Sequence, residues 1–263
     1  MIIEYDDAAL YLKKRLELEN RGNEKIRRII VNAFKELLAL AFPCPLTAQN
    51  FKLDLLPNQE GISEILKDMR TQIYLTVVEC CESVADQRRE LYGQEAFPFM
   101  VSDILEQGED SIKHKSSIYS NRITKEFETW IAMALFYKWS KNLALKMFTT
   151  NCGDLYKTNS FKRATTATKF HATRLKNGGV SYGVGHYQSS LKSLHRLNTI
   201  AIGATSRNID FQILKKLGAS GYNVYRGSSY PCAVCDFNLG FHPISADDLP
   251  PYHPNCCCFA VPV

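Results

Sequence analysis

Five of the nine cysteines lie within the last 32 residues of this 263-residue chain, and their spacing is typical of metal ligands. Cys232 and Cys235 are separated by two residues, which lets one tight turn point both sulfur atoms inward. After seventeen intervening residues, a second group begins at His253 and continues with Cys256 and Cys258. Zinc is usually held by four thiolate or imidazole ligands in a tetrahedron. The pattern therefore predicts a metal site, with zinc as the ion.

The tail offers more candidate ligands than one zinc ion needs. Cys232 and Cys235 belong to every set that fits the spacing, and three residues compete for the two remaining places: Cys256, Cys258 and His253. An all-cysteine site and a site of three cysteines with His253 both agree with a tetrahedral zinc ion. The sequence alone leaves these two sets open.

Cys257 and His242 are weaker candidates. If residues 256–258 are extended, successive side chains alternate, so Cys257 points away from its two cysteine neighbours. Two catalytic zinc motifs, H-E-x-x-H and H-x-E with P-C-x-x-C, are absent from the chain. A structural site is therefore the expectation, with a cluster of reduced or redox-active thiols as the alternative.

Long amphipathic helices are predicted to carry this tail. Apolar residues recur at helical spacing over four segments, residues 26–42, 63–91, 124–148 and 188–217. A basic helix is predicted at 160–175, and a glycine-rich loop without a complete nucleotide-binding motif at 177–185. Gly218 is a predicted helix cap, and residues 222–226 alternate as in a strand. The expected fold is α+β and predominantly α-helical, with long helices followed by a small C-terminal antiparallel β element and a zinc knuckle.

Charge divides the chain into an acidic and a basic half. Residues 1–110 carry 13 Lys and Arg against 20 Asp and Glu, a net charge of −7, whereas residues 111–263 carry 19 against 7, a net charge of +12. Between Thr129 and Ile209 the only acidic residue is Asp154. Such a stretch can attract phosphate backbones or an acidic protein, although a solvated face balanced by the acidic half explains it equally well. Three regions are expected: an acidic helical region at 1–110, a basic helical region at 111–220, and a strand with the metal-binding knuckle at 221–263.

Composition favours a globular protein made in a reducing cytoplasm. Hydrophobic residues make up 45% of the chain and charged residues 22%, both near globular averages. The most apolar early segment, residues 26–42, contains four charged side chains, which a membrane span tolerates badly. We therefore expect no membrane association. In a reducing compartment, the clustered cysteines favour a metal site over disulfides.

The tail carries a longer pattern than the ligands alone. Tyr225-Arg-Gly-Ser-Ser-Tyr-Pro leads into Cys232-Ala-Val-Cys235, and Leu239-Gly240 follows in the loop. The pattern ends with Pro250-Pro-Tyr-His253-Pro-Asn-Cys256-Cys-Cys258 and Val261-Pro-Val. This arrangement resembles the Mu F-like minor head proteins of phages, also called head morphogenesis proteins. The resemblance covers residues 220–263 and extends back to about residue 120, so residues 111–263 are expected to form one Mu F-like domain. Cys257 stands where the family commonly has Arg.

The resemblance implies a non-enzymatic component of the virion. It places the protein inside the phage head near the portal, after synthesis in the host cytoplasm. Its expected role is to aid head assembly, DNA packaging or DNA delivery, through the portal and capsid proteins and through non-specific contacts with DNA. Two alternatives stay open: a toxin or modifying enzyme that carries a Mu F-like module, and a zinc-knuckle nucleic-acid-binding protein. No Ser/His/Asp or Cys/His catalytic set is recognisable, so we do not expect an enzyme.

Overall fold

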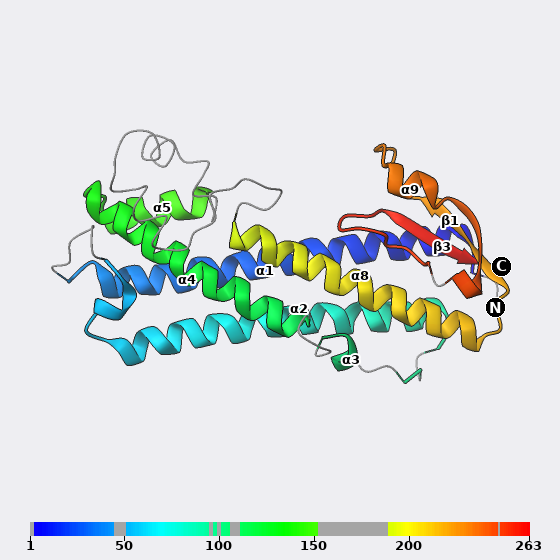
Figure 1. Ribbon diagram of the computed structural model, residues 1–263, viewed down its shortest axis with the longest axis horizontal. Helices are drawn as coiled ribbons and strands as arrows, with labels where there is room; N and C mark the ends of the chain where they lie inside the picture. Colours follow the sequence, from blue (N-terminus) through cyan, green and yellow to red (C-terminus); the bar gives the residue numbers. More distant parts are fainter. Residues whose placement is uncertain are drawn as a thin grey trace. The chain divides into compact units, whose positions relative to one another are not determined.

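The structure is a computed structural model that describes residues 3–44, 51–94, 97–98, 101–105, 111–151, 189–246 and 248–263. Most of these residues are helical, and one small antiparallel sheet lies near the C-terminus, so the fold is α+β and predominantly α-helical, as expected (Figure 1). The helices are α1 (Tyr5–Ala41), α2 (Gln59–Leu91), α3 (Ser102–Leu105), α4 (Ile112–Phe136), α5 (Lys141–Asn151), α8 (Ser190–Lys216) and α9 (Ala233–Phe237). The 3-10 turns are η2 (Leu53–Leu55) and η4 (Ile244–Ala246), and the strands are β1 (Gly221–Arg226), β2 (Gly240–Pro243) and β3 (Cys258–Pro262).

Three of the predicted elements agree closely with the structure. Helices α2 and α8 occupy the segments predicted at 63–91 and 188–217, and β1 occupies the strand predicted at 222–226. Gly218 ends α8 as predicted, because its φ of +70° suits glycine and the N–H of Ala219 bonds back to the carbonyl of Leu214 at 3.1 Å. The basic helix at 160–175 and the glycine-rich loop at 177–185 lie outside the described residues.

Helix α1 begins much earlier than the sequence pattern indicates. The predicted start was near Ile26, whereas the helix begins at Tyr5. The buried face of its first turns includes Ala8 and Leu12, but Arg15 and Glu19 follow on the same face, each 5% exposed. Because these two charged residues interrupt the apolar stripe, hydrophobic periodicity does not reveal the helix.

The single helix predicted at 124–148 is wrong, because two helices replace it. Helix α4 ends at Phe136 and α5 begins at Lys141. Lys138 takes a φ of +52°, and the N–H of Trp139 bonds to the carbonyl of Ala134 at 2.9 Å, which closes α4 in the manner of a Schellman motif. The hydroxyl of Ser140 then accepts a hydrogen bond from the N–H of Leu143 and caps α5. A lysine in the position that usually holds glycine conceals this break in the sequence.

The chain forms two compact units. The first comprises Met1–Asn23, Leu75–Lys113 and Arg196–Val263, and the second comprises Glu24–Tyr74 and His114–His195. An aromatic group forms the core of the second unit. Phe34 of α1 stacks on Phe148 of α5 with ring centroids 3.9 Å apart, and Phe127 and Trp130 of α4 contact Phe148 edge-on. All four side chains are at most 1% exposed.

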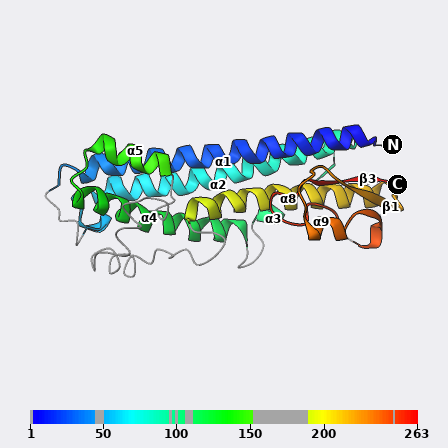
Figure 2. The ribbon, with the colours of Figure 1, turned by 90° about the horizontal axis from the view of Figure 1, so that it is seen from above.

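The first unit packs the sheet against helices. The strand order is β2-β1-β3, and both neighbours run antiparallel to β1. Tyr222 and Val224 of β1 lie in one buried cluster with Ile209 and Ile213 of α8, so the last turns of α8 lie beside the sheet (Figures 1 and 2). The same cluster contains three of the tail cysteines, Cys235, Cys256 and Cys258. Three of the five predicted ligands are therefore part of a hydrophobic core.

A buried ion pair joins α2 to α8 within the first unit. Arg88 donates two hydrogen bonds to the two carboxylate oxygens of Asp210, both at 2.5 Å, and both side chains are nearly inaccessible to solvent. Burial alone would lower the pKa of Arg88, but the carboxylate of Asp210 raises it above its ordinary value. Arg88 therefore stays charged.

None of the described helices is long and apolar enough to cross a bilayer.

Candidate metal centre

The first pair of candidate ligands is positioned by the short helix α9. Cys232 precedes the helix in an extended conformation, with φ −149° and ψ 109°, and Cys235 lies inside it. The N–H of Asp236 bonds to the carbonyl of Cys232 at 2.8 Å, which closes a single turn. One turn brings residues three apart onto the same side, so both sulfur atoms face the same point.

The second group is positioned by a turn that leads into β3. The N–H of Cys256 bonds to the carbonyl of His253 at 3.1 Å, and Asn255 takes the left-handed conformation with φ +63°. Asparagine tolerates this conformation better than most residues. The N–H of Cys258 donates to the sulfur of Cys256 at 3.4 Å, the contact by which a backbone amide stabilises a thiolate.

The two groups meet around Cys235. One set of three ligand atoms comprises Cys232, Cys235 and His253, and a second comprises Cys235, Cys256 and Cys258, with all atoms of each set within 4.8 Å of one another. The Cys235 and Cys256 sulfur atoms are 3.7 Å apart. Two thiolates on a tetrahedral zinc ion, with Zn–S bonds of about 2.3 Å, lie about 3.8 Å apart. The sulfur separation therefore matches that of a zinc site.

The imidazole of His253 is oriented toward the sulfur atoms. Its Nδ1 donates to the carbonyl oxygen of Pro254 at 2.9 Å, because that oxygen can only accept. The other ring nitrogen, Nε2, therefore carries the free lone pair, and it lies 3.2 Å from the sulfur of Cys232 and 3.1 Å from that of Cys235. A hydrogen bond that fixes the ligating tautomer in this way is usual at metal-binding histidines.

The thiols of the cluster differ in acidity. Hydrogen bonds from the backbone and side chain of Cys235 lower the pKa of Cys232 to about 7. Burial raises the pKa of Cys235 well above its ordinary value and raises the pKa of Cys258 to about 11. Buried sulfur atoms in this arrangement keep their protons unless a cation takes the place of those protons. A bound metal ion is such a cation.

Cys257 and His242 lie apart from these two sets. The sulfur of Cys257 contacts the carbonyl oxygen of Asn255 at 3.7 Å, and the residue is half-buried. His242 stacks on Tyr222 with ring centroids 5.6 Å apart, and its Nε2 bonds to the carbonyl oxygen of Asn238 at 3.1 Å. Neither belongs to the sets of atoms that can hold an ion.

The residues present fit a closed site. Cys235, Cys256 and Cys258 are each at most 4% exposed, and together with Cys232 and His253 they supply five ligand atoms. Four ligands complete a tetrahedral zinc ion and leave no position open for water or substrate. The structure groups the five ligand atoms in two overlapping sets of three that share Cys235, and these sets could hold a cation.

One residue that contacts the cluster is not indicated by the sequence pattern. Arg15 of α1 donates a hydrogen bond to the carbonyl oxygen of Cys256 at 2.5 Å, although the two residues are 241 positions apart. The sequence pattern predicts no helix at this position, so it gives no indication of this contact.

Comparison with other proteins gives no relative. No protein-family model, curated protein or solved structure matches the chain.

Proposed function

We propose that the C-terminal cluster binds one zinc ion and that the ion holds the β element closed. The convergence of two separate Cys/His groups on Cys235 carries this proposal. Cys232 and Cys235 stand before β2, and His253 and Cys256 stand before β3, so an ion bound by both groups joins the two ends of the intervening loop. Thiolate and imidazole ligands in a tetrahedral arrangement favour zinc over magnesium or calcium, which prefer oxygen.

We further propose that the protein is a minor head protein of a phage. Its C-terminal pattern resembles that of the Mu F-like head morphogenesis proteins, and the residues that carry the resemblance are those that form β1, the metal cluster and β3. A metal-closed element at the end of a helical protein suits a protein whose task is assembly. In this role the protein acts inside the head, near the portal, and aids assembly, DNA packaging or DNA delivery.

Metal analysis of the purified chain tests the first proposal. We expect one zinc ion per chain, and its loss when Cys232 and Cys235 are both changed to Ser, because the shared ligand and its neighbour are removed together. Cys257→Ser is the matched control, since it removes a tail sulfur that lies outside both ligand sets. Unchanged zinc content in the double variant would sink the metal site.

Analysis of particles tests the second proposal. Virions and empty heads are purified from cells that produce the protein, and their proteins are quantified by mass spectrometry. We expect the chain to remain with the particles in a few copies per portal ring. Its absence from both kinds of particle, with the chain present in the same lysate, contradicts a role in the head.

A further inference from the structure

A buried arginine connects the metal cluster to the first turns of α1. Arg15 donates to the carbonyl oxygen of Cys256, and its Nε lies 3.4 Å from a carboxylate oxygen of Glu19 one turn further along the helix. The side chains of Arg15 and Glu19 are only 6% and 7% exposed. A buried charge is costly unless it is compensated, so the burial of Arg15 depends on the groups that surround it.

The charge of a loaded cluster complements that of Arg15. Three thiolates outnumber the two positive charges of a zinc ion by one, and four thiolates outnumber them by two. A negatively charged centre therefore stabilises the guanidinium, and the guanidinium stabilises the centre.

Apolar contacts also join α1 to the sheet, since Ala8, Tyr11 and Leu12 lie in one buried cluster with Val224, Phe259 and Ala260. Tyr5 contacts the rings of Tyr225 and Phe259 edge-on, with centroids 5.0 and 5.1 Å apart. Leu12 lies so close to Gly227 that a Cβ added there would come within 2.3 Å of its side chain and within 2.5 Å of the carbonyl oxygen of Cys257.

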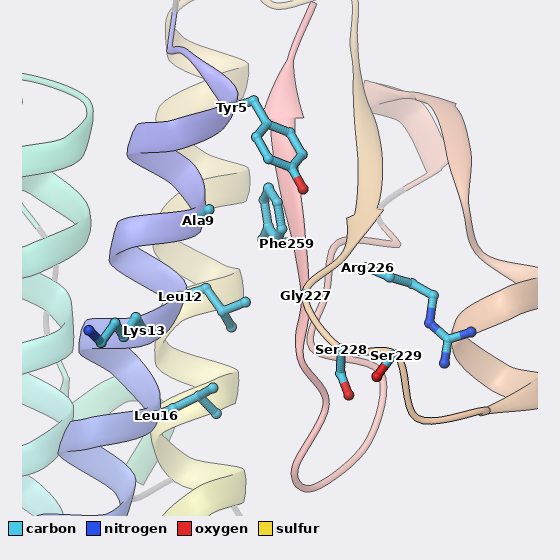
Figure 3. Close-up of a pocket in the computed structure, with 10 residues that line it drawn as sticks. All are labelled: Tyr5, Ala9, Leu12, Lys13, Leu16, Arg226, Gly227, Ser228, Ser229 and Phe259. Atoms are coloured by element: carbon cyan, nitrogen blue, oxygen red, sulfur yellow. The ribbon is translucent and has the colours of Figure 1, made fainter.

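A groove of about 620 Å³ opens between α1 and the loop that follows β1. Leu12 and Leu16 of α1 line one wall, Gly227 to Ser229 line the other, and Phe259 lies between them (Figure 3). The hydrogen bond from Arg15 therefore adds a buried polar contact to the apolar ones that join this helix to the metal-binding tail.

We propose that Arg15 is a positioning residue of the metal centre, so that metal binding and docking of α1 residues 5–19 against the C-terminal sheet stabilise each other. This inference rests on the proposed metal site and extends it to a helix at the other end of the chain. Arg15 acts through the backbone of Cys256: it holds that turn in the conformation that presents the sulfur. The coupling is reciprocal, because any free energy that the docked helix adds to metal binding is also added by the metal to docking.

Metal affinity in two α1 variants tests the first direction of the coupling. Zinc affinity is measured by competition with a chromophoric chelator, and the absorption spectrum of the Co²⁺-loaded protein reports the geometry of the site. We expect Arg15→Met to lower the affinity about 10- to 100-fold, the usual effect of losing a residue that orients a ligand. Arg15→Lys should recover part of the loss, because it retains the charge. Arg21→Met is the matched control, since Arg21 is exposed on the same helix.

Hydrogen exchange in the unaltered chain tests the other direction and needs no variant to fold. Removal of the ion by a chelator should accelerate amide exchange in residues 5–19 as well as in 227–263, and leave α4 of the second unit unchanged. Acceleration confined to 227–263, or equal zinc affinities for Arg15→Met and Arg21→Met, overturns the coupling and leaves the metal site standing. A chain that binds no zinc at all removes the metal site and the coupling with it.

Discussion

At the scale of single residues, Cys235 differs from the other tail cysteines because it belongs to both sets of ligand atoms. It lies inside α9, so its position follows from one helical turn, while its partners come from a turn that starts eighteen residues later. Its burial has a chemical consequence. A buried thiol keeps its proton in the absence of a cation, so metal and proton compete directly for this sulfur.

This competition predicts proton release on metal binding. The raised pKa values of Cys235 and Cys258 keep these thiols protonated near neutral pH, whereas Cys232, with a pKa of about 7, is already partly ionised. Zinc must therefore displace at least the proton of Cys235, and its affinity should fall as the pH is lowered from about 8 to about 6. Calorimetry in buffers with different ionisation enthalpies measures the released protons. Binding without proton release, or with an affinity that is independent of pH, would show that Cys235 is not a ligand.

At the scale of elements, helices α1, α2 and α8 bury charged residues in the first unit. Arg88 and Asp210 join α2 to α8, and Arg15 and Glu19 lie on the buried side of α1. The pair of Arg88 and Asp210 specifies that α2 faces α8, because each charge finds its compensation only in that arrangement. The apolar stripes that predict α2 and α8 do not contain that information.

The pair between α2 and α8 predicts a non-additive effect on stability. Arg88→Met should destabilise the protein by about 3–5 kcal/mol, because it leaves the carboxylate of Asp210 buried without a partner. Adding Asp210→Leu should recover most of the loss, since neither member of the pair then carries a buried charge. Urea unfolding followed by circular dichroism measures both variants. Arg70→Met, exposed on the same helix, is the control, and a double variant less stable than Arg88→Met would contradict the argument.

At the scale of the whole molecule, the strongest asymmetry is that of charge. Twelve Lys or Arg and one acidic residue lie between Thr129 and Ile209. Residues 152–188, which contain part of this stretch, lie outside the described residues. From its charge alone, such a stretch is expected to attract the phosphate backbone without reading bases.

This charge predicts DNA binding that depends steeply on salt. The affinity for duplexes of unrelated sequence should be similar, and a plot of its logarithm against that of the salt concentration should be linear with a negative slope. Changing Lys162, Arg163 and Lys169 to Gln should reduce the slope by up to about three, one for each lost phosphate contact. Changing Lys35, Lys52 and Lys67 to Gln is the control, with the same loss of charge on exposed residues outside this stretch. Equal slopes for the two triple variants would exclude the basic stretch as the contact surface.

Much of the molecule follows from local patterns. The period of apolar residues predicts α2 and α8, the glycine after α8 predicts its end, and the C-x-x-C and H-x-x-C spacings predict which side chains approach a metal ion. The predictions of α2, α8 and the end of α8 are confirmed, and the predicted Cys and His side chains come together in groups that could hold a metal ion. Each of these depends on residues within a few turns of one another, where backbone geometry alone determines the neighbours.

Tertiary structure alone decides the rest. A glycine-type helix end at Lys138 divides one predicted helix, and buried charges at Arg15 and Glu19 hide the start of α1. The contact between Arg15 and Cys256 spans 241 positions. No periodic signal can encode such a contact, because it exists only after the helix and the sheet have packed together and removed both groups from water. The sequence therefore determined the ligand types of the metal cluster, and the packing decided which helix supports them.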